Sequence, residues 1–310
     1  MENLNTYLQE LIQKHRSNTE GTTANYIPEL ARVATDKFAM AIVTCDGTIY
    51  QAGDVEVPFT LQSTSKPFVY AMALEEHGRE FMRSRVGVEP SGEAFNSIVE
   101  LEKQTHRPYN PMINSGAIAV SSFIKDQKGL SREKRVLDLF GAYTNHQLAI
   151  DEKVFQSEKQ TAHRNRSIAH LLRHFDVIGD DIDESLDLYF KQCSILVNTI
   201  DLALMAGTLA NNGVQPQTKK IIVKPDYIAD VLSLMLTCGM YDSAGEWAYT
   251  VGLPAKSGVS GGLLAVVPGK MGIAAYSPLI DQQGHSIRGV LAIKELVKKY
   301  KLSMFRSTHN

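Results

Sequence analysis

The chain has 310 residues, of which 44% are apolar and 21% charged, with a formal net charge of −2 at pH 7. These values are typical of a globular protein with a sizeable core, and they exclude charge-driven binding to nucleic acid or an anionic membrane. Three cysteines, Cys45, Cys193 and Cys238, occur without a paired motif, which fits a reducing compartment and unpaired thiols. No window approaches the roughly 20 apolar residues of a membrane-spanning helix.

The first predicted element is an amphipathic helix at the N-terminus, because Leu4, Leu8, Leu11 and Ile12 recur at helical spacing. This segment lacks a basic start followed by an apolar stretch, so we expect no secretion signal and a cytoplasmic protein. Next, residues 38–45 are apolar and residues 48–52 follow the pair Asp46-Gly47. An Asp-Gly pair between two such runs predicts a hairpin with a two-residue turn.

The middle of the chain, from about residue 66 to 235, has a largely helical pattern. One predicted helix covers residues 194–210 and stops at Asn211-Asn212-Gly213, residues that tolerate a left-handed helix cap. Beyond Trp247, short apolar runs cut by glycine predict antiparallel strands in WAYTVGLP, LLAVVPG and MGIAAYSP. A final helix is expected over residues 286–300.

Strands near both chain ends with helices between them predict the α+β class. We expect one domain over residues 1–310, with an antiparallel sheet assembled from both chain ends and flanked by helices. A helical lobe over roughly residues 68–235 would be attached to that sheet.

The tetrad Ser-x-x-Lys occurs three times, at Ser63/Lys66, Ser122/Lys125 and Ser131/Lys134, so the tetrad by itself is weak evidence for catalysis. Ser131 precedes an amphipathic run where a helix N-cap is expected, and capping explains it fully. Ser122 lies inside an apolar helical stretch, where serine is commonly a packing residue.

Ser63 differs because Pro67 follows it by four residues. Proline is tolerated only near the start of a helix, so the helix must begin near Ser63 and place its hydroxyl at the positive end of the helix dipole. Lys66 is then one turn further on. Capping by Ser63 beside a solvated lysine would explain the same pattern.

Catalysis by this pair requires a neutral lysine, because a serine hydroxyl is a poor nucleophile until a base takes its proton. With an ordinary pKa of ~10.4, only about one lysine in 2,500 is neutral at pH 7. A buried, mostly dry pocket is therefore required to lower the pKa of Lys66.

A second motif supports the catalytic interpretation. Lys256-Ser257-Gly258 is the only Lys-Ser/Thr-Gly in the chain and lies among glycines where an edge strand is expected. Penicillin-recognising enzymes combine Ser-x-x-Lys with Lys-Thr-Gly in this order. Their third element is matched only by Tyr143-Thr144-Asn145, expected in a loop between helices. That mismatch and the missing export signal argue against a cell-wall peptidase or β-lactamase.

The sequence resembles the serine-dependent glutaminase family, which has a β-lactamase-like fold, in its compact bacterial form. The resemblance covers nearly the whole chain, from about residue 25 to 286. It is carried by the stretches NYIPELA, VTCDG, PFTLQSTSKP, EPSGEAFNS, NPMINSGAI, SEKQTAHRNRSIA, YFKQCS, LTCGMYD and VGLPAKSGVSGG.

The resemblance implies hydrolysis of L-glutamine to L-glutamate and ammonia through a serine acyl-enzyme, with no cofactor and no metal. It implies that Ser63 is the nucleophile, Lys66 its base and Tyr241 a proton relay. The backbone N–H groups of Ser63 and Val259 would form the oxyanion hole. The substrate pocket would be completed by Tyr26, Asn114, Glu158, Asn165 and Tyr189. A homotetramer or dimer is implied as well.

This set suits free glutamine, because its α-ammonium needs an acidic partner such as Glu158 and its α-carboxylate needs neutral donors. A surface charge at Glu158 and a turn residue at Asn114 are the competing readings. Two alternative functions stay open: a cytoplasmic serine esterase or amidase, which has no use for Glu158, and a non-catalytic glutamine-binding protein, which has no use for Ser63 and Lys66.

Two further patterns do not predict metal sites. His170 and His174 are four residues apart, but no glutamate completes a zinc motif. Asp181, Asp183 and Ser185 begin like a calcium loop, but Leu186 stands where glycine is required. We expect this cluster to precede a helix.

Overall fold

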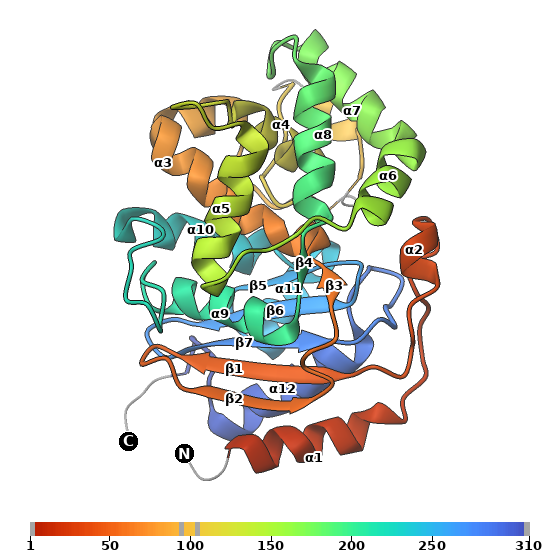
Figure 1. The fold of residues 1–310 in the computed structure, drawn as a ribbon, viewed down its shortest axis with the longest axis vertical. Coiled ribbons are helices and arrows are strands. Elements are labelled where there is room, and N and C mark those ends of the chain that lie inside the picture. The colour runs from red at the N-terminus through yellow and green to blue at the C-terminus, as the bar shows by residue number, and fades with distance from the viewer. Residues whose placement is uncertain (1–3, 93–95, 103–105, 307–310) are drawn as a thin grey trace.

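The computed structural model describes residues 4–92, 96–102 and 106–306. Residues 93–95, in the stretch EPSGEAFNS, lie outside the described residues. A five-stranded antiparallel sheet in the order β2-β1-β7-β6-β5 forms the base of the molecule (Figure 1). Its strands are β1 (Ala39–Thr44), β2 (Ile49–Gly53), β5 (Ala255–Ser257), β6 (Gly262–Val267) and β7 (Met271–Tyr276). The α+β class and the sheet built from both chain ends are therefore confirmed.

The helices of the described part flank this sheet or stack above it. They are α1 (Leu4–Arg16), α2 (Pro28–Ala31), α3 (Lys66–Arg85), α4 (Asn114–Phe123), α5 (Arg132–Thr144), α6 (Glu152–Thr161), α7 (His163–His174), α8 (Ile182–Cys193), α9 (Thr199–Ala210), α10 (Pro225–Cys238), α11 (Ala244–Thr250) and α12 (Ile287–Tyr300). Two short strands, β3 (Phe59–Thr60) and β4 (Leu196–Val197), pair separately from the main sheet. Among the described residues, no helix is both long and apolar enough to cross a membrane.

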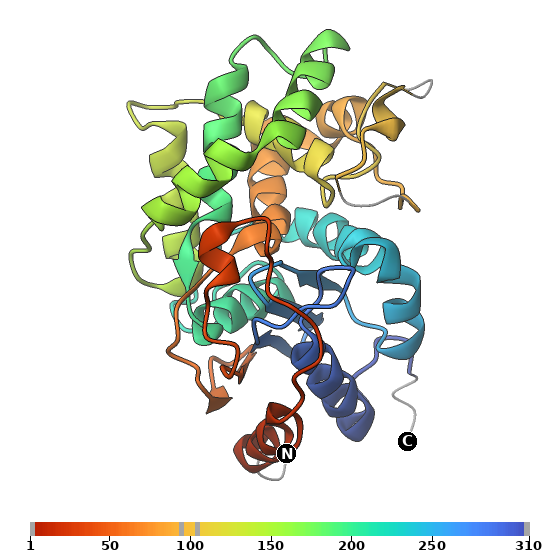
Figure 2. The same cartoon turned by 90° about the vertical axis from the view of Figure 1, so that its right-hand side faces the viewer.

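Both faces of the sheet are covered over its three central strands, which explains why β1, β6 and β7 are largely apolar and buried. Along β1, Met40 and Ile42 join the core cluster under α1 and α12, whereas Ala41 and Val43 join the cluster on the opposite side. Helices α1 and α12 lie side by side on the outer face (Figure 2).

On the inner face, α9 approaches the sheet very closely. A Cβ on Gly272 of β7 would lie 2.1 Å from the backbone nitrogen of Gly207, so only glycine fits there. Helix α9 therefore packs on the sheet, although it lies within the range 68–235 expected for the helical lobe. Helices α3 to α8 stand above it (Figure 1).

The predicted hairpin forms, but its turn is longer than expected. Thr44 N–H donates to Thr48 O over 3.0 Å, and Gly47 N–H donates to Thr44 O over 2.9 Å. Gly47 has a φ of 98°. These bonds close a three-residue loop with a left-handed glycine at its end. The two-residue turn was wrong because Gly47 occupies the third loop position.

The stretch WAYTVGLP is not a strand, because its first half belongs to α11. Met240, Ala244, Trp247 and Val251 are all buried in one core cluster and recur at helical spacing. The Trp247 indole Nε1–H donates to Leu253 O over 2.8 Å, which fixes the chain after the helix. Aromatic β-propensity was overridden here by tertiary packing.

Helix α9 begins later than predicted, at Thr199, because Asn198 and Asp201 form a capping box and residues 196–197 form β4. Its predicted end is confirmed, with Asn212 and Gly213 in the left-handed region. Tyr143-Thr144-Asn145 is the end of α5 rather than a loop between helices, and Asn145 is the left-handed cap.

Other local predictions are confirmed. Leu4, Leu8, Leu11 and Ile12 are buried in α1. Ser131 is the N-cap of α5, its Oγ accepting from Lys134 N–H. Ser286 caps the final helix, which starts at the next residue. Asp181 stands at the N-cap position of α8, as expected of a cluster that precedes a helix.

Arg288 ties the N-terminal segment to the sheet. This side chain is 2% exposed, its Nε–H donates to Asn18 O over 2.7 Å, and its Nη1 donates to Thr35 O over 2.8 Å. We expect Arg288→Met to lower stability by about 1–3 kcal/mol, because the carbonyls of Asn18 and Thr35 would lose a charge-assisted donor.

Thermal unfolding followed by circular dichroism measures this effect as a lowered Tm. Lys298→Met, on the exposed side of the same helix, is the control and should leave the Tm within about 1 °C. An unchanged Tm in Arg288→Met would contradict the assigned role.

Candidate active site

Ser63 lies in a short 3-10 turn, Gln62–Ser65, that runs directly into α3. Pro67 is the second residue of α3, where its missing N–H costs no hydrogen bond. Ser63 therefore lies at the N-terminus of α3, as the position of Pro67 predicted. It is 8% exposed and lines a cavity.

Lys66 is fully enclosed, at 1% exposure, and its Nζ donates to Asn114 Oδ1 over 2.8 Å and to Met112 O over 3.3 Å. Burial lowers the pKa of Lys66 to about 8, because the ammonium loses its water, and the nearby Glu158 opposes this only in part. About one such lysine in ten is neutral at pH 7. The dry environment required for a lysine base is present.

Tyr241 is a further side chain that contacts Ser63. It lies in the 3-10 turn Tyr241–Ser243 after α10 and has a φ of 50°, a left-handed conformation that is rare for an aromatic residue and typical of functional sites. Its hydroxyl shares a hydrogen bond with the Ser63 side chain and donates to Ser257 O over 3.2 Å. Burial raises the pKa of Tyr241 far enough that the phenol stays protonated at neutral pH.

The Lys-Ser-Gly motif lies on β5, the edge strand of the sheet, as predicted. Lys256 is fully buried, its Nζ lies 4.0 Å from the centre of the Tyr241 ring, and it donates to Ser257 O over 2.8 Å. Burial and the charge of Lys66 hold the pKa of Lys256 well below its usual range. Lys256 has no role in the site predicted from the sequence, although it belongs to this motif.

The end of β5 lies against the turn Gln62–Ser65, which contains Ser63. A Cβ on Gly258 would lie 3.0 Å from Leu61 O and 3.1 Å from the Thr64 side chain, so glycine permits this approach. In the described part of the chain, the backbone N–H groups of Ser63 and Val259 donate no hydrogen bond. Both are available to an incoming oxyanion.

A cavity of about 330 Å³ opens in front of Ser63. The predicted substrate-binding residues among its lining are Tyr26, Ser63, Asn114, Glu158, Asn165, Tyr189 and Val259. Lys66 and Tyr241 are buried and do not line this cavity, but Lys66 contacts its wall through Asn114. The structure thus brings all the predicted residues to one place, from segments far apart in the sequence.

Glu158, on α6, is a buried carboxylate with one hydrogen-bond donor and no ion pair among the described residues. It is 8% exposed, and Gln62 Nε2 donates to its Oε1 over 2.7 Å. Burial raises the pKa of Glu158 to about 7, opposed by this hydrogen bond and by the charge of Lys66. Such a group gains from a cationic ligand. The surface-charge reading of Glu158 is wrong.

Gln62 is a site residue that the sequence analysis missed. It has a φ of 50°, precedes the nucleophile and orients the Glu158 carboxylate. Its only sequence signal is its place beside Ser63.

Asn114 has a double role in the geometry. It begins α4, its Oδ1 accepts from Lys66, and its Nδ2 donates to Asn165 Oδ1 over 3.1 Å. Tyr189 on α8 is 3% exposed, with Lys66 Nζ 6.0 Å from its ring centre. Tyr26 precedes α2 in the N-terminal segment and remains 52% exposed at the rim.

Nothing in the described part of the chain gathers three or more potential metal ligands. The groups present instead are a serine hydroxyl, a low-pKa amine, a phenol and two backbone donors at or next to one cavity. This arrangement can perform acyl transfer on an amide whose other end carries a positive charge.

Comparison with known proteins places the chain among one family. The family model described as Glutaminase matches residues 21–305. A protein of Trichormus variabilis named Glutaminase is 54% identical over 300 residues, covering 97% of this chain and 90% of its own length.

Solved structures agree with this comparison. A probable glutaminase, ybaS, superposes with a TM-score of 0.95 at 41% identity, covering 98% of this chain and 99% of that one. The structure titled Mglu in its glutamate form gives a TM-score of 0.94 at 39% identity, covering 100% of this chain and 71% of that one.

Proposed function

The chain belongs to the glutaminase family and is a glutaminase, and from that premise we propose that Ser63, Lys66 and Tyr241 carry out the reaction on L-glutamine. The observation that supports this most directly is the meeting of a phenol-bonded serine, a low-pKa lysine and an unpaired buried carboxylate around one cavity. The esterase and the non-catalytic binding protein have no counterpart among the relatives named above.

In the proposed first half-reaction, neutral Lys66 takes the proton of Ser63 as its Oγ attacks the side-chain amide carbon of glutamine. The carbonyl oxygen becomes an oxyanion held by the N–H groups of Ser63 and Val259, where one lost donor costs ~10²–10³ in rate. The proton that Lys66 accepted passes through Tyr241 to the leaving nitrogen, so ammonia departs while Lys66 is neutral and Tyr241 protonated again. Water then cleaves the acyl-enzyme to glutamate and restores the serine.

The opposite end of the pocket would hold the amino-acid group. Glu158 pairs with the α-ammonium, while Asn114, Asn165 and Tyr189 supply neutral contacts for the α-carboxylate. The glutamate form of Mglu supports a product-binding pocket in this family. Release of ammonia from L-glutamine by the purified protein tests the function, and no release would overturn it.

We expect Glu158→Gln to raise the KM for glutamine about 100-fold and to change kcat less, because the variant loses the charge that binds the ammonium in the ground state. The amide oxygen can still accept from Gln62, so the wall of the pocket is preserved. Steady-state kinetics measure the split between KM and kcat.

Glu152→Gln is the matched control, because Glu152 lies exposed at the start of the same helix. It should leave both constants unchanged. A Glu158→Gln enzyme with the wild-type KM would remove Glu158 from substrate binding.

Kinship with penicillin-recognising enzymes is proposed on the shared order of Ser-x-x-Lys, helical lobe and an edge strand with Lys-Ser-Gly. The single domain with a lobe over roughly residues 68–235, the cytoplasmic location and the homotetramer or dimer stay predictions from the sequence. Size-exclusion chromatography with light scattering measures the oligomeric state.

A further inference from the structure

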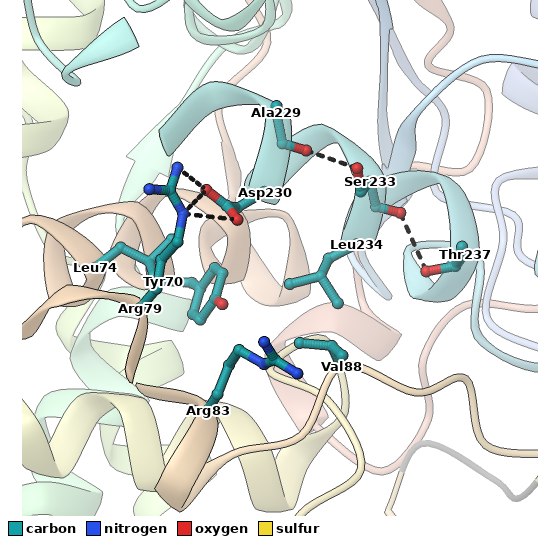
Figure 3. A pocket seen from close by; sticks show the side chains of 10 residues that line it. All are labelled: Tyr70, Leu74, Arg79, Arg83, Val88, Ala229, Asp230, Ser233, Leu234 and Thr237. Carbon is teal, nitrogen blue, oxygen red and sulfur yellow. Dashed lines mark hydrogen bonds and ion pairs between the residues drawn. The ribbon is translucent and has the colours of Figure 1, made fainter. Parts of the chain in front are cut away.

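A second cavity, of about 410 Å³, lies between α3 and α10 and shares no lining residue with the catalytic pocket. Figure 3 shows its side chains converging from these two helices and from Val88, in the segment that follows α3. Nothing in the proposed reaction uses this space.

The charged groups of the cavity leave one cation unpaired. Arg79 is held by Asp230, its Nε donating to Oδ1 and Oδ2 over 3.1 and 2.9 Å. The side chain of Arg83 has no hydrogen bond or ion pair within the described part of the chain. Its guanidinium faces the cavity beside Val88 (Figure 3).

The hydroxyl of a buried tyrosine adds a second free donor. Tyr70 is 4% exposed, lines the cavity, and its hydroxyl meets no partner among the described residues. The hydroxyls of Ser233 and Thr237 are already used, because they donate to Ala229 O over 2.7 Å and to Ser233 O over 3.1 Å. The remaining hydrogen-bonding capacity of the cavity therefore suits an acceptor with negative charge.

The rest of the lining is apolar, with Val88 and Leu234 next to the space between the two donors and Leu74 beyond Tyr70. An inorganic anion would leave these side chains without contact. We propose that the cavity binds a small monocarboxylate with an apolar body, its carboxylate on Arg83 and Tyr70, and that its occupation changes the rate at the catalytic site.

Two helices connect the cavity to the catalytic groups. Tyr70 lies one turn after Lys66 on α3, which begins at the turn Gln62–Ser65. Thr237 lies at the end of α10, four residues before Tyr241. A ligand that packs between α3 and α10 therefore acts on the two helices that set the distance between Lys66 and Tyr241.

A third connection runs through the backbone next to Val88. Gly87 N–H donates to Pro108 O over 2.8 Å, and Glu89 N–H donates to Tyr109 O over 2.9 Å. Three residues beyond Tyr109, the carbonyl of Met112 accepts from the catalytic lysine. Thus α3, α10 and the segment around Val88, which line the cavity, each connect to a residue of the proposed catalytic site.

Isothermal titration of the full chain with hexanoate tests binding, in the presence of saturating L-glutamate so that the catalytic pocket is occupied. We expect one hexanoate per chain, with at least about tenfold weaker binding of 1-hexanol, acetate and inorganic phosphate. Arg83→Gln and Tyr70→Phe should each weaken hexanoate about tenfold or more. Arg85→Gln is the matched control, because Arg85 packs on Phe81 and donates to Asp176 O, outside the cavity.

The glutaminase rate measured with and without hexanoate tests whether the ligand regulates the enzyme. This test rests on the proposed function, whereas the detection of hexanoate binding by calorimetry does not. We expect hexanoate to change kcat of the wild type at least twofold and to leave Arg83→Gln unaffected. The proposal would be overturned if hexanoate did not bind, if Arg83→Gln bound it as tightly as the wild type, or if phosphate bound more tightly. It would also be overturned if hexanoate changed only KM and this effect persisted in Arg83→Gln. Binding without any change in kcat would overturn it as a regulatory site.

Discussion

Replacing Ser63 by alanine is expected to lower kcat for L-glutamine by at least about 10⁴-fold, since no acyl-enzyme can form without the hydroxyl. Loss of the nucleophile in a serine protease costs on the order of 10⁶-fold, and the residual rate comes from the oxyanion hole and binding alone. Substrate affinity should survive, because Glu158 and Asn114 remain in place. Ammonia release gives the rate, and calorimetry with glutamate gives the affinity.

The chain provides a matched control in a second Ser-x-x-Lys tetrad. Ser131→Ala removes the N-cap of α5, where Oγ accepts from Lys134 N–H over 3.2 Å. It should cost about 1 kcal/mol of stability and leave kcat unchanged. If Ser63→Ala kept more than a tenth of the wild-type kcat, the acyl-enzyme mechanism would be wrong.

Lys66→Met is expected to lower kcat/KM by at least about 10³-fold, because general-base catalysis contributes ~10²–10⁴ and the nucleophile stays inactive without it. Methionine fills nearly the same buried space, so the cavity should not collapse. Lys134→Met, in the tetrad of the capping serine, is the control and should keep wild-type kinetics.

The pH dependence gives this prediction a second, independent measurement. Below its pKa of about 8, Lys66 is mostly protonated and cannot accept a proton, so kcat/KM should rise about tenfold per pH unit up to pH 8 and then level off. Glu158, with a pKa of about 7, must be ionised to bind the ammonium, so it steepens the rise below pH 7. Both groups act in the same direction.

In Lys66→Met the inflection near pH 8 should disappear, whereas the Glu158 inflection should persist at a pH above 7, because the charge of Lys66 no longer lowers that pKa. A wild-type profile that is flat between pH 6 and 9 would exclude Lys66 as the base. The profile of Glu158→Gln separates the two groups, because only the lysine inflection should remain.

The element types were largely accessible from the sequence, because they depend on local patterns. The helical spacing of its apolar residues predicts α1, with Leu4, Leu8, Leu11 and Ile12 on its buried face. Ser131 caps α5, the helix that follows it, through its own side chain. The failures occurred where packing overrides local preference. Trp247 lies in a helix although its neighbours favour a strand, because burial of one helical face decided the conformation.

Part of the site was also accessible, for a geometric reason. Pro67 limits where a helix can begin, and this one constraint placed Ser63 and Lys66 one turn apart at the helix start. The Lys-Ser-Gly motif and the long matches to a known family gave the other residues. Gln62 and Lys256 received no role, because their contacts are with residues distant in the sequence.

By itself, then, the sequence determined the position of Ser63 at a helix start, the α+β pattern and the family, since each depends on residue type and short-range spacing. Only the tertiary structure decided the pKa of Lys66 and of Glu158, because a pKa depends on how much water the fold removes and which charges it brings near. The unpaired guanidinium and phenol of the second cavity were likewise decided by the packing of α3 against α10, which no local pattern encodes.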